Sequence, residues 1–337
     1  MRTRDGRTES RYPFPVTVPG ARFVRPRVIA ALAAVAASVG IAVFGPNPNP
    51  YLRSAERFHD FLHVPGFALV AALLLAAFPG PPPGPGPHRR GRHLARVFAA
   101  AVGLGVAVEL LQAVAGGDVS LPDVARDAGG AAAAVLVAAS FWPGVQPARR
   151  WALRLAAAVT VAAFTQPTIE ALLEERRARA QFPVLADFSH PGEMGRFKWS
   201  AQTIAVPVAG DAGGGAGRGV RLLLSPGRYP GFTLAHFPRD WRAYRDLVLT
   251  CTNPSPEPLP VTIRIDDRRG DRGYEDRFNG RYVLQPGRNV VRVSLAEVAA
   301  APRRRRLNLA RIRQVVVFTV NLPEPRELLL ESLRLER

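Results

Sequence analysis

The sequence predicts two parts of different fold class, a multi-pass α-helical membrane bundle followed by an all-β jelly-roll sandwich. Long apolar segments crowd before Pro167, whereas short β-rich runs separated by Gly, Pro and Asn follow it. With 337 residues the chain is long enough for two domains of ordinary size. The overall averages, 47% hydrophobic residues and a mean hydropathy of +0.02, hide this division.

The charge balance narrows the classes of partner. Lys and Arg number 45 against 27 Asp and Glu, which gives a formal net charge of +18. Such an excess suits either nucleic acid or anionic lipid. The arginines flank apolar segments instead of interleaving with aromatic residues, so we expect a lipid bilayer as partner and no nucleic acid. Cys251 is the only cysteine, which excludes an intrachain disulfide.

The first half begins with an Arg-rich cytoplasmic tail at residues 1–27. Five membrane spans are then expected, at residues 28–44, 62–79, 97–115, 124–142 and 151–166. The first ends in a Pro-rich turn without a small-residue cleavage site, which indicates an uncleaved span. Several are shorter than the roughly 20 residues that a bilayer needs, a deficit that membrane thinning and snorkelling arginines can cover. A buried soluble bundle is the alternative.

The distribution of arginine predicts the topology. Arginine is dense in the tail, in residues 80–96 and in 148–154, but sparse in the polar loops expected at 46–62 and 115–125. This alternation is the positive-inside pattern of a chain that starts in the cytoplasm. Five spans in the cell membrane then place everything after Pro167 on the extracytoplasmic side. If residues 151–166 do not cross, the second half is cytoplasmic.

The second half changes its periodicity. Residues 167–182 predict a short amphipathic linker helix, and residues 183–337 contain eight short β-rich runs bounded by turn residues. Runs of this length and spacing predict an antiparallel β-sandwich. The Gly-rich stretch 209–219 is interpreted as a loop, since no helix start follows it as a phosphate-binding loop requires.

A polar hairpin interrupts the apolar first half. Glu109 and Gln112 are three residues apart, and Asp123 and Asp127 four apart, so each pair shares a helix face. His63 opens a span at the same outer level. Ionisable groups at membrane depth are costly and usually face a protein interior or a wet cavity. Together these groups can bind a divalent cation or act as acid and base; the alternative is that they only hold helices together.

The hairpin resembles the VanZ-like family of small membrane proteins. The pattern is E-x-x-Q, then Asp, a polar residue four positions on and Gly three further, and it covers about residues 28–145 together with His63 and Phe67. The resemblance implies a cell-envelope role, with glycopeptide-antibiotic resistance in the namesake and no settled biochemical activity.

The sequence departs from that family at three places. Asp118 stands where the family usually has Arg, Asp127 where it has Asn, and His59-Asp60 where it has Asp-Lys. These changes make the expected pocket more acidic, so a cation is the favoured ligand over a bare anion.

A looser resemblance covers residues 183–337. The arrangement of DRFNG, YVLQPGRN and ESLRLE is similar to galactose-binding-like jelly-roll carbohydrate-binding modules. It implies glycan binding, with stacking candidates Trp199, Tyr229, Trp241, Tyr244 and Tyr274 and hydrogen-bonding candidates Asp266, Asp267, Asp276, Arg277 and Asn279. It also implies a structural calcium site at Asp187 and Glu331. The alternatives are aromatic residues that pack in the core and charged residues that are merely solvated.

Three functions follow as hypotheses. The leading one is an accessory envelope protein, with a role in glycan binding or antibiotic tolerance, whose sandwich holds an envelope glycan or lipid-linked glycan near the hairpin. The second is a membrane enzyme that acts on a lipid-linked or head-group substrate through Glu109, Asp123, Asp127 and His63. The third is a sandwich that binds another protein. The sequence contains no Walker-type loop, CxxC, HExxH or GxSxG motif.

Overall fold

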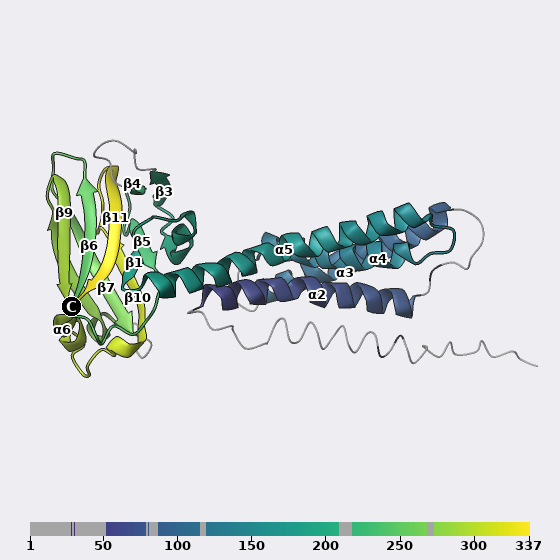
Figure 1. Cartoon of the computed structure of the whole chain (residues 1–337), viewed down its shortest axis with the longest axis horizontal. Coiled ribbons are helices and arrows are strands. Elements are labelled where there is room, and N and C mark those ends of the chain that lie inside the picture. Colours follow the sequence, from purple (N-terminus) through teal and green to yellow (C-terminus); the bar gives the residue numbers. More distant parts are fainter. Residues whose placement is uncertain are drawn as a thin grey trace, which may run out of the picture.

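The computed structural model describes residues 52–78, 87–114, 119–208, 218–267 and 273–337, together with residues 28, 30 and 80. It contains a helical part and a β part joined by one long helix (Figure 1). The tail expected at residues 1–27 and the span expected at 28–44 lie outside the described residues, apart from 28 and 30.

The helical part is an antiparallel bundle (Figure 1). Its members are α2 (Arg53–Ala77), α3 (Pro87–Val114), α4 (Leu121–Ser140) and α5 (Pro147–Gln181). α4 packs against each of the other three. Within the described residues, three helical segments are long and apolar enough to cross a membrane: 53–77, 89–114 and 147–181.

Two expectations about the helices are corrected. Residues 53–62, predicted as part of a polar loop, form the first turns of α2. α5 runs without interruption through Pro167, so the last expected span and the expected linker helix are one helix. Tertiary packing of α2 against α5 explains both outcomes. The Thr168 hydroxyl donates to the Arg57 carbonyl at 3.0 Å, which fixes these two segments side by side.

Glycines allow the helices of the bundle to approach closely. A Cβ atom on Gly130 would lie 2.1 Å from the Val64 carbonyl oxygen, and one on Gly129 would lie 2.2 Å from the Phe164 ring. Only glycine fits where a helix backbone meets its neighbour in this way. The outward surface of the bundle is apolar and exposed, and includes Leu69, Leu110, Leu111, Leu155 and Val159.

The β part is a sandwich of two antiparallel sheets, as the sequence predicts. The first sheet has the order β3-β4-β11-β6-β9, and β1 pairs with the C-terminal part of β11. Its strands are β1 (Val184–Ala186), β3 (Thr203–Val208), β4 (Gly219–Leu224), β6 (Asp246–Asn253), β9 (Gly287–Ser294) and β11 (Arg326–Glu336).

The second sheet has the order β2-β5-β10-β7-β8. Its strands are β2 (Phe197–Trp199), β5 (Gly231–Leu234), β7 (Leu259–Asp267), β8 (Phe278–Leu284) and β10 (Ile312–Phe318). Short helical turns complete the β part: η1 (Pro191–Arg196), η2 (Tyr274–Asp276), α6 (Leu295–Ala300) and η3 (Leu309–Arg311).

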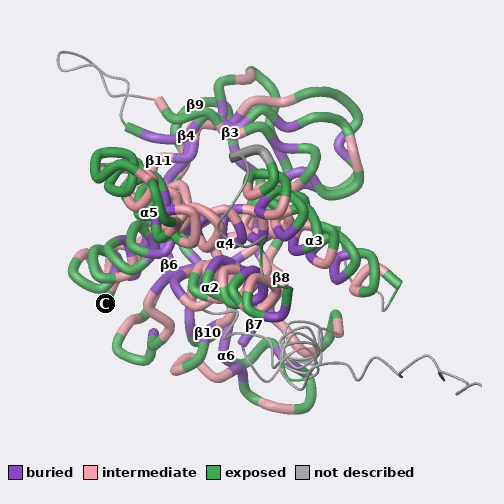
Figure 2. Tube along the Cα trace, turned by 90° about the vertical axis from the view of Figure 1, so that its right-hand side faces the viewer, coloured by how far each residue is buried: buried purple, intermediate pink, exposed green. Residues whose placement is uncertain are grey.

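Alternating residues of both sheets fill the core between them, and the buried stretches along the strands are visible in Figure 2. Ile263, Val315 and Leu333 are among the fully buried members. Cys251 is also buried, and burial, followed by the nearby charge of Glu331, raises the pKa of its thiol to about 12. The thiol is therefore protonated and unreactive in the folded protein.

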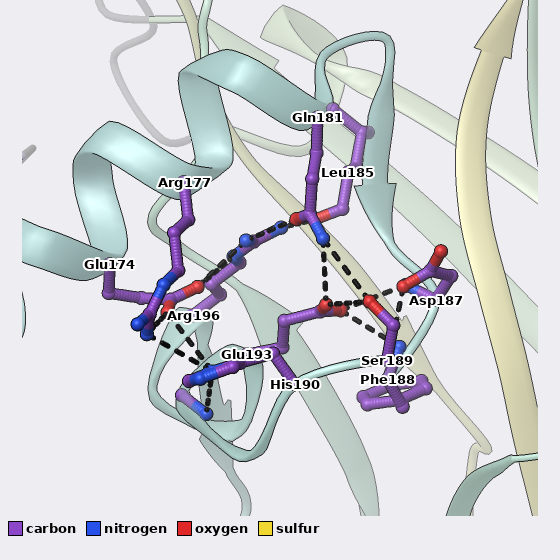
Figure 3. Close-up of polar contacts among 11 residues, drawn as sticks. Glu174, Arg177, Gln181, Leu185, Asp187, Phe188, Ser189, His190, Glu193 and Arg196 are labelled. Atoms are coloured by element: carbon purple, nitrogen blue, oxygen red, sulfur yellow. Dashed lines mark hydrogen bonds and ion pairs between the residues drawn. The ribbon is translucent and has the colours of Figure 1, made fainter.

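A buried ion pair joins the sandwich to the bundle (Figure 3). The guanidinium of Arg196 donates to Glu174 Oε1 of α5 from Nε at 2.9 Å and from Nη2 at 2.7 Å. It also donates to Gln181 Oε1 at 2.7 Å and to the Leu185 carbonyl at 2.6 Å. Both charged side chains are almost fully buried, at 2% and 6% exposure. The end of α5 is thereby fixed to β1 and η1.

A second carboxylate shapes the turn beside this pair (Figure 3). Glu193 is fully buried, and its Oε2 accepts hydrogen bonds from the backbone N–H groups of Asp187 and Phe188 at 2.9 and 2.8 Å. The start of α2 reaches the same region, where Glu56 lies 3.5 Å from Lys198 Nζ. Both α2 and α5 therefore hold the sandwich.

Replacement of Arg196 should separate the two parts. In Arg196→Met the Glu174 carboxylate stays buried without its cation, and we expect the free energy of unfolding of the sandwich to fall by about 3–5 kcal/mol. Arg177→Met is the matched control, because Arg177 is 49% exposed and lies 3.8 Å from the same carboxylate; it should cost at most about 1 kcal/mol. Hydrogen exchange of β1 and η1 in the full chain measures both, and equal protection in the two variants would contradict the expectation.

Candidate functional site

The exposed face of the five-stranded sheet carries a cleft of about 920 Å³. Strand register builds its floor. One row of paired residues crosses all five strands, from β2 to β8: Lys198, Thr233, Val316, Arg264 and Asn279. All five residues line the cleft. Side chains in register point to the same face of a sheet, so this row sets charged, hydroxyl, apolar and amide groups side by side.

A second row runs beside the first. Gly231, Phe318, Thr262 and Arg281 are in register across β5, β10, β7 and β8, and they too line the cleft. The floor is therefore mixed, with the Phe318 ring between hydroxyl and guanidinium groups. A concave surface with a few placed polar groups among apolar ones is typical of a ligand site.

Two tyrosines stand at the edges of the cleft. Tyr229 is 48% exposed and Tyr274 65% exposed. The Tyr229 ring packs edge-on against Phe318, with centroids 5.5 Å apart. Tyr274 lies in η2, where its carbonyl accepts a hydrogen bond from Asn279 Nδ2 at 3.1 Å and the Arg277 guanidinium lies 5.8 Å from its ring centroid. Both rings can offer a face to a ligand.

The described lining of the cleft carries cations and no carboxylate. Its charged members are Lys198, Arg264, Arg277 and Arg281. Arg264 is 26% exposed, and its Nε forms an ion pair with Asp266 Oδ2 at 3.3 Å. Burial lowers the pKa of Arg264; Asp266 opposes this, and the charges of Arg277 and Arg313 add to the lowering. Arg264 therefore lies near other positive charges and is paired with Asp266.

Five of the predicted glycan-binding residues meet at this cleft: Trp199, Tyr229, Tyr274, Arg277 and Asn279. Trp199 lies on the edge strand β2, where it pairs with the buried Phe232. Its ring stacks on the ring of Phe197, with centroids 5.2 Å apart. Packing therefore occupies most of its ring, and the two tyrosines are the better stacking surfaces.

The other predicted residues are placed elsewhere, which corrects those expectations. Trp241 is fully buried and donates from its indole nitrogen to the Pro238 carbonyl at 3.0 Å. Tyr244 packs edge-on against Phe182, with ring centroids 5.3 Å apart. Trp241 belongs to the core and Tyr244 is partly buried against it, as the packing alternative for these aromatic residues predicted.

The predicted aspartates serve the scaffold. Asp266 accepts a hydrogen bond from Gln314 Nε2 at 2.6 Å beside Arg264. Asp267 accepts from Arg305 at 2.6 and 2.8 Å, and Asp276 accepts from the same guanidinium at 2.5 Å. This bridge raises the pKa of Arg305 and fixes the η2 turn that carries Tyr274.

The predicted metal sites find no ligand set. Asp187 accepts from the Ser189 backbone at 3.0 Å, while Glu331 accepts from Thr252 Oγ1 at 2.6 Å and Arg288 Nε at 3.0 Å. Throughout the described part of the chain, no three His, Cys, Asp or Glu side chains converge as a metal site requires. The calcium ion expected here and the divalent cation expected at the hairpin stay predictions.

The polar hairpin does bring residues together within the bundle. His63 Nδ1 lies 2.9 Å from Oδ1 of the buried Asp127. Glu109, also buried, accepts from the Ser120 backbone N–H at 2.7 Å. Gln112 lies half-buried on the last turn of α3.

An arginine that sequence reasoning missed completes this group. Arg126 pairs with Asp123 and lies 3.2 Å from Asp60 Oδ2. The resemblance to the VanZ-like family suggested that this group lacks an arginine, because Asp118 stands at the family's Arg position. Arg126 supplies a positive charge from another position, so the group is less acidic than expected and a cation is no longer the favoured ligand. The sequence did carry a signal for this pair, because Arg126 follows Asp123 by three residues and side chains at that spacing meet on one face of a helix. The group lies in the half of the bundle nearer the sandwich, since α2 and α4 contribute it from their first turns (Figure 1).

Comparisons with known proteins add little to this geometry. No protein-family model matches the chain, and no curated protein does. Among solved structures, a family 11 carbohydrate-binding module from Clostridium thermocellum in complex with a β-1,3-1,4-mixed-linked tetrasaccharide is 12% identical, with a TM-score of 0.36 over 45% of this chain and 94% of that one.

Two further structures are similar over the same part of the chain. An exo-β-agarase is 13% identical, with a TM-score of 0.37 over 45% of this chain and 24% of that one. A non-crystalline cellulose specific module, CBM28, is 8% identical, with a TM-score of 0.32 over 43% of this chain and 88% of that one. At such low identities and TM-scores, a ligand for this chain has to be inferred from its own side chains.

Loss of the arginine bridge should loosen the η2 turn at the cleft. In Arg305→Gln the buried Asp267 loses its cation, so we expect hydrogen exchange of residues 273–277 to rise by roughly tenfold or more, as loss of a charged hydrogen-bond pair implies. Arg303→Gln is the control, because Arg303 is 73% exposed and its partner in the same turn, Glu275, is also exposed. Exchange that rises equally in both variants, or in neither, would contradict this role for Arg305.

Proposed function

We propose that this chain is an integral membrane protein of the cell envelope whose sandwich binds a polysaccharide through the cleft on its five-stranded sheet. The cleft itself carries the proposal. Its two in-register rows offer hydroxyl, amide and guanidinium groups for sugar hydroxyls, and exposed Tyr229 and Tyr274 offer ring faces at its edges. A sugar ring has an apolar face and a hydroxylated rim, which this combination complements.

The outer surface of the bundle supports placement in a membrane. Leucines and valines are exposed along the helices, and a soluble protein rarely exposes so continuous an apolar surface. At the end away from the sandwich, Arg154 lies over the rings of Phe141 and Trp151 at 4.8 and 5.3 Å. Aromatic residues with arginine mark the cytoplasmic interface of a membrane protein. The sandwich would then be extracytoplasmic.

Glycan retention by the full chain tests this proposal. We expect the protein in lipid nanodiscs to bind at least one polysaccharide of an envelope and plant-wall panel in biolayer interferometry. Tyr229→Ala/Tyr274→Ala should weaken that binding by about tenfold or more, because two stacking surfaces worth roughly 1 kcal/mol each are lost. Val290→Ala, an exposed change on the opposite sheet, should leave it unchanged. No binding to any polysaccharide, or binding that the tyrosine variant retains, would refute the proposal.

A second candidate function is enzymatic. The observation that favours it is the pairing of His63 with the buried Asp127, because a carboxylate that orients an imidazole is a common arrangement for general acid–base catalysis. The VanZ-like resemblance of the same hairpin fits a reaction on a lipid-linked or head-group substrate. Arg126 would hold an anionic head group beside the pair.

The enzyme hypothesis has its own test. Nanodiscs containing the full chain and an envelope lipid extract should yield a changed head group by mass spectrometry, and His63→Gln should abolish the change at equal protein level. His59→Gln is the control, since His59 is a partly buried histidine one turn before His63 on the same helix. An unchanged lipid profile, or a change that survives in His63→Gln, would exclude this function.

A further inference from the structure

The end of the bundle away from the sandwich carries a dense basic patch. Helices α3 and α5 both begin at this end (Figure 1), and near their starts they expose Arg89, Arg92, Arg96, Arg149 and Arg150. We infer that this basic patch binds anionic phospholipids of the surrounding leaflet through their phosphate head groups. The inference rests on the proposed placement of the bundle in a membrane and adds the chemistry of the lipid. It does not depend on glycan binding by the cleft.

Two neighbouring arginines have a different role, within the fold. Arg90 Nη1 donates to the Pro143 carbonyl at 3.3 Å, and Arg154 Nε donates to Ser140 Oγ at 3.2 Å. These bonds hold the starts of α3 and α5 against the end of α4 and the turn that follows it. The five exposed arginines of the basic patch are thereby brought to one end of the bundle.

The charge of the basic patch is not balanced by the chain around it. Residues 61–108 and 128–169 contain no aspartate or glutamate, and the five guanidinium groups have no partner within the described part of the chain. Arg89, Arg92 and Arg96 share one face of α3, where like charges at this spacing repel one another. The partial positive charge at the start of a helix adds to that repulsion. Anionic groups from outside the chain would relieve both effects.

The order of side chains along α5 favours a lipid over other anions. After Arg149 and Arg150 come Trp151, Leu155 and Val159, which are 68%, 64% and 58% exposed. From Arg149 to Val159 the helix rises by about 15 Å. Over this length a charged, an aromatic and an aliphatic surface follow one another, as phosphate, interface and hydrocarbon do across one leaflet of a bilayer. A nucleic acid or an acidic protein would complement the arginines alone.

Quenching of tryptophan fluorescence by brominated lipid tests the inference. The full chain is placed in phosphatidylcholine nanodiscs that contain the same small fraction of either brominated phosphatidylglycerol or brominated phosphatidylcholine. Trp142 and Trp151 lie beside the basic patch, whereas Trp199 and Trp241 belong to the sandwich and would be out of reach of the acyl chains.

We expect the brominated phosphatidylglycerol to associate with the protein about fivefold more strongly or better, because each arginine near an anionic head group adds to the attraction. Raising sodium chloride from about 0.05 to about 0.5 M should reduce that preference, since exposed charges are screened.

Substitutions locate the effect. Arg92→Gln/Arg149→Gln/Arg150→Gln should reduce the preference by about threefold or more without lowering the temperature of thermal unfolding, because all three side chains are exposed. Lysine at the same three positions should retain most of the preference, since the attraction is ionic. Arg242→Gln/Arg245→Gln is the control in the sandwich, where these side chains are 69% and 81% exposed, and should have no effect.

Three results would contradict the inference in different ways. Equal quenching by the two brominated lipids, or a preference that the glutamine variant retains, would overturn it and leave the membrane placement intact. Loss of the preference when single-stranded poly-dT of equal charge is added would overturn it in favour of a nucleic-acid surface. Tryptophan fluorescence that neither brominated lipid quenches would overturn both the inference and the membrane placement.

Discussion

The arrangement of the two parts depends on one buried ion pair, between Arg196 of η1 and Glu174 of α5 (Figure 3). Removing two charges from water is costly, and additional hydrogen bonds to the pair help to offset that cost. Here the guanidinium also binds Gln181 and the Leu185 carbonyl, so its donors are used on both sides of the joint. Such a pair stabilises one arrangement of α5 and η1 and destabilises others, in which a buried charge would lack its partner.

The consequence of this joint is a fixed position for the cleft. β2 begins directly after Arg196, and β2 supplies Lys198 to one edge of the cleft. The same lysine reaches Glu56 near the start of α2. One end of the cleft is therefore adjacent to the bundle, and the arginines of β7 and β8 lie at the other end.

The sequence predicted the fold class because each part shows its own periodicity. Uncharged apolar segments indicated the helices, and alternating runs such as LPVTIRIDD indicated the strands. Boundaries were harder, since α2 begins within an expected loop and α5 continues through Pro167. In both places the local sequence suggests a break in the helix. Contacts between distant segments, such as Thr168 with Arg57, stabilise the helix instead.

The candidate site was predicted in part for a related reason. Tyr229, Tyr274, Arg277 and Asn279 stand in turns or at strand starts, where polar and aromatic residues suggest function. Arg264 and Thr262 alternate with buried residues on β7, and only the pairing of β7 with β8 and β10 puts them beside Arg281 and Phe318. Strand order and register depend on long-range contacts that a single sequence does not reveal. Likewise, nothing local distinguishes the buried Trp241 from an exposed platform.

The proposal that the sandwich binds an envelope polysaccharide is tested most directly by the side of the membrane on which the sandwich lies. Such a polysaccharide is available only outside the cytoplasm. Fusion of a reporter after Arg337 measures it: alkaline phosphatase is active only after export, whereas green fluorescent protein exported in unfolded form stays dark. The account predicts an active phosphatase fusion and a dark fluorescent fusion. An inactive phosphatase fusion with a bright fluorescent fusion, at equal protein levels, would contradict it.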